Sequence, residues 1–201
     1  VASDSDLVAE LITAELASRL DQPTSVALEA SLMKVLPRLE GAFSFVLMDT
    51  ERVYGVRDPS GLRPLCLGRK DGSWVVASES PALDIVGATF VREITPGEVV
   101  VTDDAGPRSH HPFPAERVHP SLCLFEFVYF ARPDTQLQGE SVHHARVRQG
   151  EMLAEQAPVE ADMVMGVPES GVPAAEGYAR ASGIPFGQGL VKNRYIGRTF
   201  I

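Results

Sequence analysis

The stretch MVMGVPESGVPAAEGYARASGIPFGQGL, residues 163–190, decides the fold of the second half of the chain. Residues 163–167 are short and apolar, as in a buried strand, and a helix is predicted to start near Pro173 and to end at Gly183. Residues 184–190 begin the next strand. A strand, a helix and a strand within about 28 residues are typical of a parallel βαβ unit.

The loop from Pro168 to Val172 joins the first strand of that unit to its helix. Ligands of open α/β sheets bind at this edge, where N–H groups and the positive end of a helix face an anion. Glu169 adds a carboxylate that would repel bare phosphate, so the loop suits a site where a metal ion or a ribose hydroxyl lies between protein and phosphate. An ordinary βα connection is the alternative, because every α/β protein has several.

The first half of the chain is predicted to be a layered α+β domain. Apolar residues recur at helical spacing from Leu7 to Leu20, and a second helical stretch runs from Thr24 to Leu36 before Pro37 ends it. Short apolar runs joined by turns, among them Asp58-Pro59-Ser60-Gly61, then predict an antiparallel meander. Its strands are expected at residues 43–48, 52–56, 65–67, 74–77 and 98–101.

Residues 103–120 are rich in Pro, His, Asp and Arg and lack periodicity, so the domain boundary is placed there. Beyond it, residues 122–130 are apolar, and their aromatic side chains are expected in a core rather than on a cofactor platform; these are Phe125, Phe127, Tyr129 and Phe130. A helix is predicted over residues 142–157. The pairs His110-His111 and His143-His144 have no partner cluster and are interpreted as surface residues.

Composition limits the possible functions. The 201 residues include 18 Lys and Arg against 27 Asp and Glu, a formal charge of −9, which argues against broad binding to nucleic acid. No apolar stretch approaches the roughly 20 residues of a membrane span. Two distant cysteines make no disulfide framework, so a reducing, cytoplasmic setting is expected. The chain starts at Val1 without an initiator Met, and we expect an excerpt from a longer protein.

Three further features each have two interpretations. Asp4 could cap a helix, or it could hold a ligand ammonium group through charge-assisted hydrogen bonds. The run from Lys192 to Thr199 carries three cations and is either a solvated loop or a contact for a phosphate-rich ligand. Cys123 has no CxxC spacing and is typical of an inert, buried cysteine.

Four longer stretches together resemble one family, the glutamine phosphoribosylpyrophosphate amidotransferases, also called amidophosphoribosyltransferases. The resemblance extends from the first residues to the last. Its motifs are far more specific than a match to GxGxxG. The matching stretches are Asp58–Leu65 (DPSGLRPL), Val76–Ser80 (VASES), Cys123–Asp134 (CLFEFVYFARPD) and Lys192–Ile201 (KNRYIGRTFI).

The resemblance implies an α+β domain followed by an α/β domain. Residues 1–118 would be the C-terminal part of a class II glutamine amidotransferase domain, the end of an N-terminal-nucleophile αββα sandwich. Residues 119–201 would be the N-terminal part of a phosphoribosyltransferase domain, the start of a type I parallel sheet. In the family, glutamine is hydrolysed in the first domain, and ammonia passes through a channel to the second. There it displaces pyrophosphate from phosphoribosylpyrophosphate, the first committed step of purine synthesis.

Site residues follow from the resemblance position by position. Asp4 matches the aspartate that binds glutamine. The pyrophosphate loop matches Glu169, Ser170 and Gly171, with Ser170 also associated with Mg²⁺. Cys123 matches the first ligand of a [4Fe-4S] cluster, which other members of the family lack. The mobile loop, which also helps to form the ammonia channel, matches a set of four residues: Lys192, Arg194, Tyr195 and Arg198.

Other expected parts of the family are absent from these residues. The nucleophilic Cys, the Arg that binds glutamine and the Asn-Gly of the oxyanion hole should lie before Val1, and the acidic ribose-binding stretch should follow Ile201. We therefore expect no catalytic residue and no activity from this piece alone. The resemblance also implies feedback by purine nucleotides and a homo-oligomer. Two alternatives are a non-catalytic nucleotide-binding regulatory module and a sugar-aminating glutaminase. The loop at Glu169 and the run from Lys192 to Thr199 count against the latter, because both belong to the phosphoribosyl half of the family.

Overall fold

The computed structural model describes residues 3–193 and 195–197. The chain divides into two compact units, Val1–Leu122 (unit 1) and Cys123–Ile201 (unit 2), which are described separately. No helix among the described residues is both long and apolar enough to cross a membrane.

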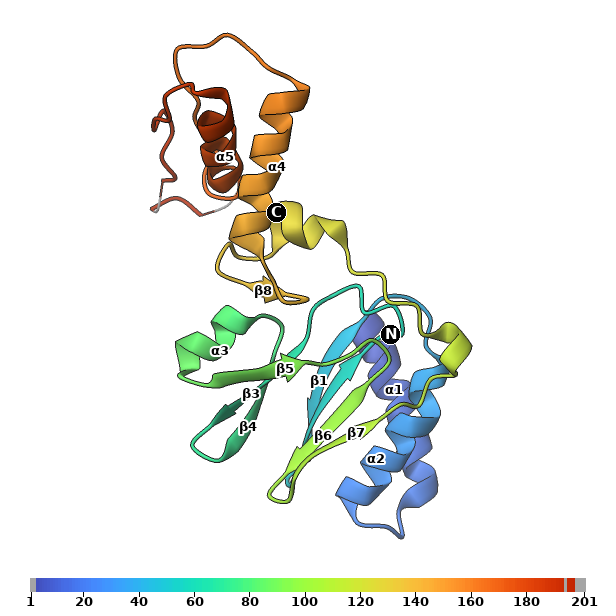
Figure 1. Cartoon of the computed structure of the whole chain (residues 1–201). Coiled ribbons are helices and arrows are strands. Elements are labelled where there is room, and N and C mark those ends of the chain that lie inside the picture. Colours follow the sequence, from blue (N-terminus) through green and yellow to red (C-terminus); the bar gives the residue numbers. More distant parts are fainter. Residues whose placement is uncertain (1–2, 194, 198–201) are drawn as a thin grey trace. The chain divides into compact units, whose positions relative to one another are not determined.

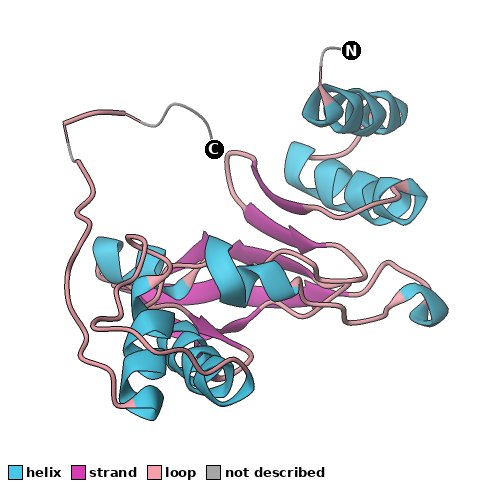
Figure 2. Ribbon diagram, turned by 90° about the horizontal axis from the view of Figure 1, so that it is seen from above, coloured by secondary structure: helices cyan, strands magenta, loops and turns pink. Residues whose placement is uncertain are grey.

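Unit 1 begins with two helices that lie side by side, α1 (Asp4–Leu16) and α2 (Thr24–Val35) (Figures 1 and 2). Short 3₁₀ turns, Ala17–Arg19 and Leu36–Arg38, extend them. Both helices are where the apolar spacing predicted them. The cap of α1 is Ser3, whose hydroxyl accepts a hydrogen bond from the N–H of Asp6 at 3.2 Å. The interpretation of Asp4 as the cap is therefore wrong, because Asp4 is already the first helical residue.

Two antiparallel sheets follow the helices. The first has the order β1-β2-β6-β7, and the second has the order β4-β3-β5. The antiparallel pairing was predicted, but the meander was not correct, because the chain leaves the first sheet after β2 and returns at β6. The strands are β1 (Ser44–Met48), β2 (Val53–Arg57), β3 (Cys66–Lys70), β4 (Ser73–Ala77), β5 (Thr89–Glu93), β6 (Val99–Asp103) and β7 (Gly106–His110).

Three elements of unit 1 lie where the sequence showed no regular pattern: α3 (Ser80–Val86), β5 and β7. Strand β7 occupies part of the expected linker, and it is a polar edge strand with no apolar run. His110 on this strand is not a partnerless surface residue, since its Nε2 lies 2.9 Å from Oε1 of Glu29.

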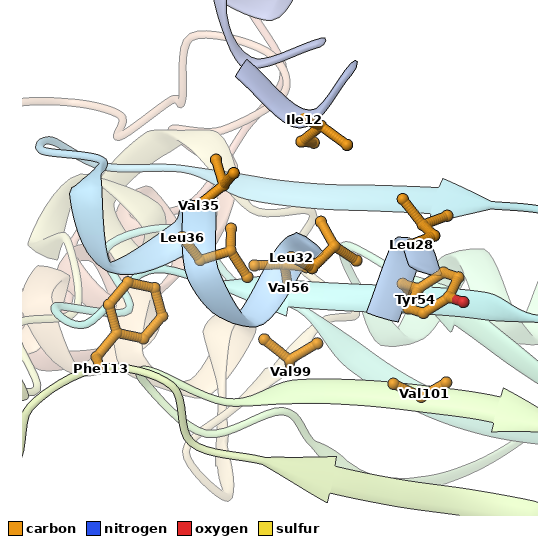
Figure 3. Packing of buried hydrophobic residues seen from close by; sticks show 10 residues of the cluster. All are labelled: Ile12, Leu28, Leu32, Val35, Leu36, Tyr54, Val56, Val99, Val101 and Phe113. Atoms are coloured by element: carbon orange, nitrogen blue, oxygen red, sulfur yellow. The ribbon is translucent and has the colours of Figure 1, made fainter. Parts of the chain in front are cut away.

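The side chains of β6 show how the layers of unit 1 pack against each other. Val99 and Val101 point to the helices, whereas Val100 between them points to the second sheet, and all three are fully buried. The core between α1, α2 and the first sheet is drawn in Figure 3. Leu65, Leu67 and Ile94 pack with Val100 between the sheets. Cys66, Leu83 and Ala88 form a third cluster beneath α3, so the layers run helix, sheet, sheet, helix.

Unit 2 contains a π-helical turn (Glu126–Phe130), a small hairpin of β8 (Gln136–Leu137) and β9 (Glu140–Ser141), and two helices. Helix α4 (Val142–Gln156) and helix α5 (Val172–Ser182) pack against each other (Figure 1). Both helices were predicted, and α5 ends at Gly183, which has the expected positive φ of 74°.

Two expectations for unit 2 are corrected. The strands predicted over residues 163–167 and 184–190 are reduced to a single parallel bridge between Val164 and Phe186. The aromatic side chains of Phe125, Tyr129 and Phe130 are not in a core, since each is 47–49% exposed. Their ring centroids lie 5.4–6.1 Å from one another.

Candidate functional site

One cleft of unit 2 lies at the end of the parallel bridge. The N–H of Val164 donates to the carbonyl of Pro185, and the N–H of Gly187 donates to the carbonyl of Val164, both at 2.9 Å. This pairing brings the loop after Val164 beside the segment after Phe186. The cleft of about 180 Å³ is lined by residues between Gly166 and Val172 on one side and between Phe186 and Lys192 on the other.

The loop wall of the cleft is tightly folded. The N–H of Gly171 donates to the carbonyl of Val167 at 3.1 Å, and the N–H of Val172 donates to the carbonyl of Glu169 at 3.3 Å. Among the described residues, none accepts a hydrogen bond from the N–H of Glu169 or Ser170. These two N–H groups stand just before α5, at the positive end of its dipole, where an anion is favoured.

Glycine is required at both ends of this loop. A Cβ on Gly166 would lie 2.7 Å from the Cα of Val172, and a Cβ on Gly171 would lie 2.9 Å from the carbonyl oxygen of Val167. Both neighbours are backbone atoms, so neither can move without the loop moving. The two glycines therefore keep the loop backbone close to the start of α5.

Charged side chains from the two walls meet at the cleft. Oε2 of Glu169 lies 3.7 Å from Nζ of Lys192, and the side chains are 66% and 48% exposed. Among the described residues of the basic run, Lys192 lines the cleft, while Tyr195 is 99% exposed. The N–H of Tyr195 donates to Oδ1 of Asn193 at 2.9 Å. Arg194 and Arg198 lie outside the described residues.

Asp4 is in unit 1, in the first turn of α1, and it is exposed. Because Ser3 already caps the helix, the carboxylate of Asp4 is not needed for that purpose. Its position leaves it accessible to a ligand, but the structure brings no other predicted site residue beside it within unit 1.

Comparison with known proteins gives a single, consistent result. A sequence model described as a glutamine amidotransferase domain matches residues 1–85. The amidophosphoribosyltransferase of Mycobacterium tuberculosis is 56% identical over 174 residues, which are 87% of this chain and 32% of that protein. The enzyme of Bacillus subtilis is 43% identical over 199 residues, which are 99% of this chain and 40% of that protein.

Solved structures agree. A structure described as the allosteric regulatory enzyme of purine biosynthesis superposes with a TM-score of 0.86 at 44% identity, covering 99% of this chain and 41% of that one. Glutamine phosphoribosylpyrophosphate amidotransferase from B. subtilis, complexed with ADP and GMP, gives a TM-score of 0.87 at 44% identity, covering 100% and 42%. The chain belongs to the amidophosphoribosyltransferase family. It spans about a third to two-fifths of the length of these relatives.

Family membership raises the question of a [4Fe-4S] cluster at Cys123. The cluster needs four thiolates, and the chain has two cysteines. Cys66 is buried in unit 1, and burial followed by the nearby Glu93 and Glu79 raises the pKa of its thiol to about 11, so it stays protonated at neutral pH. Within the described part of the chain, no three His, Cys, Asp or Glu side chains are grouped to hold a metal. Cys123 is thus a single candidate ligand, and the described residues supply no complete ligand set for a cluster.

The Mg²⁺ expected in the family is a different case. Mg²⁺ is usually held by one or two protein oxygens while substrate phosphates supply other ligands. Glu169 and Ser170 offer a carboxylate and a hydroxyl in the loop that borders the cleft, and both are hard oxygen donors. This donor set fits an ion that arrives together with a phosphate ligand.

The family stretch Asp58–Leu65 holds a feature that the sequence analysis missed. The preceding Arg57 is 3% exposed, and its guanidinium donates to the carbonyls of Ile94 at 2.6 Å, Gly61 at 2.9 Å and Arg63 at 3.0 Å. Asp58 is fully buried and accepts from the N–H groups of Ser60 and Gly61 at 2.8 and 3.0 Å. The stretch and Arg57 thus form a network of hydrogen bonds that fixes the conformation of the turn. The adjacent Arg-Asp pair before a Pro-x-Gly turn was the available signal.

A second buried arginine supports unit 2. Arg146 on α4 is 1% exposed and donates to the carbonyls of Phe127 at 2.6 Å and Ala131 at 2.8 Å. It thereby fixes the C-terminal end of the π-helical turn that follows Cys123.

Proposed function

We propose that this chain forms part of an amidophosphoribosyltransferase that converts glutamine, phosphoribosylpyrophosphate and water to 5-phosphoribosylamine, glutamate and pyrophosphate. The observation that carries this proposal is the cleft between the loop at Glu169 and Lys192, in a chain 56% identical to a curated amidophosphoribosyltransferase. Open N–H groups at a helix start, a lysine and hard oxygen donors are what a metal-bound diphosphate requires.

The two units suit the two halves of that reaction. We assign residues 1–118 to the glutaminase domain, and the helix, sheet, sheet, helix layers of unit 1 support an αββα sandwich. We assign residues 119–201 to the start of the phosphoribosyltransferase domain, and the parallel bridge between Val164 and Phe186 supports a parallel sheet.

Each predicted site residue has a role in this proposal. Asp4 would pair with the ammonium group of glutamine. Glu169, Ser170 and Gly171 would hold the pyrophosphate group, and Ser170 would also contact Mg²⁺, which supplies positive charge to the leaving pyrophosphate when it is bound. The closing loop would contain Lys192, Arg194, Tyr195 and Arg198. As a cluster ligand, Cys123 would need three further thiolates that the described residues do not supply.

Purine nucleotides are proposed as ligands of the whole protein, because the B. subtilis neighbour is described as a complex with ADP and GMP. A nucleotide-binding regulatory module without catalysis is less well supported, since the relatives at 41–56% identity are all described as amidophosphoribosyltransferases. A homo-oligomer in the cytoplasm stays a prediction.

The proposal is tested with Asp4→Asn in the full-length enzyme. The variant loses the charge that pairs with the ammonium group, so glutamine-dependent activity should fall by a factor on the order of 10 to 100, the value of a charged hydrogen bond. Activity with added ammonia should be retained. Asp6→Asn in the same helical turn is the matched control and should retain both activities. Equal loss of both activities in Asp4→Asn would show that Asp4 acts on folding instead.

A further inference from the structure

The five residues that carry Lys192 to the cleft, 188–192, have few contacts to hold them. All five are exposed, and among the described residues none of their backbone groups takes part in a backbone–backbone hydrogen bond. The parallel bridge ends just before them, since its last hydrogen bond is the one that the N–H of Gly187 donates to the carbonyl of Val164. The place of Lys192 beside Glu169 therefore depends on contacts of side chains.

Met165 supplies such a contact, because its thioether lies on Gly189. A Cβ added to Gly189 would overlap Sδ of Met165 and would lie 3.4 Å from its Cε. The sulfur thus occupies the space that a side chain at position 189 would fill. A polarizable thioether on a flexible chain packs well into an irregular gap of this kind. Gly189 stands three residues before Lys192, so the contact holds the segment close to the lysine.

Met163 makes the same contact two residues earlier. A Cβ on Gly187 would overlap Sδ of Met163 and would lie 3.1 Å from its Cγ. Residues i and i+2 of an extended segment lie on one face, so the two methionines and the two glycines share one face of the bridge. The contacts differ in what else holds the glycine. Gly187 is also fixed by its hydrogen bond to Val164, whereas Gly189 has no backbone hydrogen bond within the described part of the chain.

We propose that Met165 is a positioning residue of the cleft, which by packing on Gly189 holds the segment before Lys192 so that the ammonium group reaches the ligand. The proposal rests on the proposed function of the cleft and adds to it a residue that touches neither the ligand nor the reacting atoms. Met165 is 47% exposed and does not belong to the lining of the cleft. Its effect on the ligand therefore has to pass through the segment that ends at Lys192.

The test measures the ammonia-dependent activity of the full-length enzyme at a series of phosphoribosylpyrophosphate concentrations. Met165→Ala removes the thioether and leaves Gly189 without its contact. KM for phosphoribosylpyrophosphate should rise about fivefold while kcat changes little, as expected when binding is lost equally from the ground state and the transition state. Met165→Leu restores apolar bulk over Gly189 and should return KM to near the wild-type value.

Two other methionines of unit 2 serve as matched controls. Met163→Ala should raise KM much less than Met165→Ala does, since the hydrogen bond of Gly187 keeps that glycine in place. Met152→Ala removes an exposed methionine of α4 that is outside the cleft lining, and it should leave KM and kcat unchanged.

Gly189→Ala tests the same contact from the other side. Its methyl group would take the place of the Met165 sulfur, so the segment has to shift and KM should rise as it does in Met165→Ala. Circular dichroism melting curves establish that each variant is folded. Gly189→Ala decides the question if Met165→Ala does not fold, and an unchanged KM in Gly189→Ala would overturn the proposal.

A double variant tests whether Met165 acts through Lys192. Lys192→Gln alone should raise KM, and adding Met165→Ala should raise it no further, because the position of the segment no longer matters once the ammonium group is gone. If the two effects multiply, Met165 acts independently of Lys192 and the proposal is overturned.

Failure of this proposal can be told apart from failure of the proposed function. If the wild type converts phosphoribosylpyrophosphate and ammonia but Met165→Ala has the KM of the wild type, the positioning proposal is overturned and the proposed function stands. A fall in kcat that Met165→Leu does not restore also overturns it, since Met165 would then support the fold of unit 2. If the full-length wild type releases no pyrophosphate from phosphoribosylpyrophosphate and ammonia, the proposed function fails and the positioning proposal fails with it.

Discussion

The two units of this chain differ in the side chains that hold their elements together. Unit 1 buries charged side chains deep in its layers, including Arg57, Asp58 and Glu98, which are 0–3% exposed. In unit 2 the residues buried along α4 and α5 are mostly small, among them Gly150, Ala154, Ala175, Gly177 and Ala179. Unit 1 is thus built on layers of large apolar side chains with charges buried among its turns, and unit 2 on a close contact between two helices.

The difference shows that the units are stabilised in different ways. In unit 1 the buried charges are bonded to backbone groups of turns, so they fix how the strands connect while the apolar layers supply the hydrophobic core. In unit 2 the contact between α4 and α5 is the main one, and it depends on a close approach of two backbones. Gly150 and Gly177 make that approach possible, because added Cβ atoms would lie 1.8 Å from the carbonyl oxygen of Ala174 and 2.0 Å from that of Val147.

The largest effect is expected from Arg57→Met, which removes a buried guanidinium and leaves the carbonyls of Ile94, Gly61 and Arg63 without their donor. Loss of one partner in a buried charged network typically costs about 4 kcal/mol of unfolding free energy. Hydrogen exchange measured by mass spectrometry on peptides across the chain should show faster exchange in unit 1, with unit 2 unchanged. Lys70→Met, which is exposed on β3, is the control and should exchange like the wild type. An equal rise in hydrogen-exchange rates in both units would contradict the inference that the two units are stabilised separately.

A second effect should appear on acidification of unit 1. Burial disfavours the charged form of Glu98, but hydrogen bonds from Arg92, Ser109 and Thr95 outweigh this and lower the pKa of its carboxyl to about 2. Because this pKa is below the value of about 4.5 in the unfolded chain, the stabilisation is complete above pH 4.5 and is lost as the pH falls toward 2. The loss is about 3 kcal/mol in order of magnitude.

Glu98→Gln isolates that contribution. The difference in unfolding free energy between wild type and variant should be largest at neutral pH and should shrink steadily between about pH 4.5 and pH 2. Urea titrations at a series of pH values measure it. A difference that stays constant through this range would show that the ionisation of Glu98 does not stabilise unit 1.

The close approach in unit 2 is tested with Gly150→Ala. Glycine to alanine in a helix ordinarily stabilises by about 1 kcal/mol, because alanine loses less conformational freedom on folding. Here the added methyl group meets the backbone of α5, so we expect a loss of about 2 kcal/mol instead. Hydrogen exchange should accelerate in α4 and α5 but not in unit 1. Glu155→Ala, at an exposed position of α4, is the control, and a stabilising Gly150→Ala would refute the close packing.

The same contrast explains what the sequence could predict. Helices α1, α2, α4 and α5 were found because each has a periodic apolar pattern or clear stop residues. Strand β7 was missed because an edge strand can be polar. It forms by antiparallel pairing with β6, and its own residues show no apolar pattern. The order of the strands within the two sheets was missed, because pairing between segments that are distant in the sequence leaves no local signal.

The site was predictable in parts for similar physical reasons. The loop at Glu169 follows from a strand, a turn and a helix in succession. Its proximity to Lys192 depends on the parallel bridge between Val164 and Phe186, which no local pattern reveals. The exposure of Phe125 and Tyr129 was mispredicted because hydrophobicity favours burial but does not guarantee a neighbour to be buried against.

The smallest effect concerns the start of unit 1, where the capping and binding roles can be separated. Ser3 accepts the hydrogen bond from the N–H of Asp6, so Ser3→Ala should destabilise α1 by about 1 kcal/mol. Asp4→Asn should change the exchange rates of residues 4–16 much less, because its carboxylate is exposed and does not serve as the cap. If Asp4→Asn instead loosened α1 as much as Ser3→Ala does, its loss of glutamine-dependent activity would follow from helix fraying. If α1 stays intact in Asp4→Asn while that activity falls, the effect belongs to the charge that Asp4 presents to the ligand, and the first turn of α1 is then part of the glutamine-binding site.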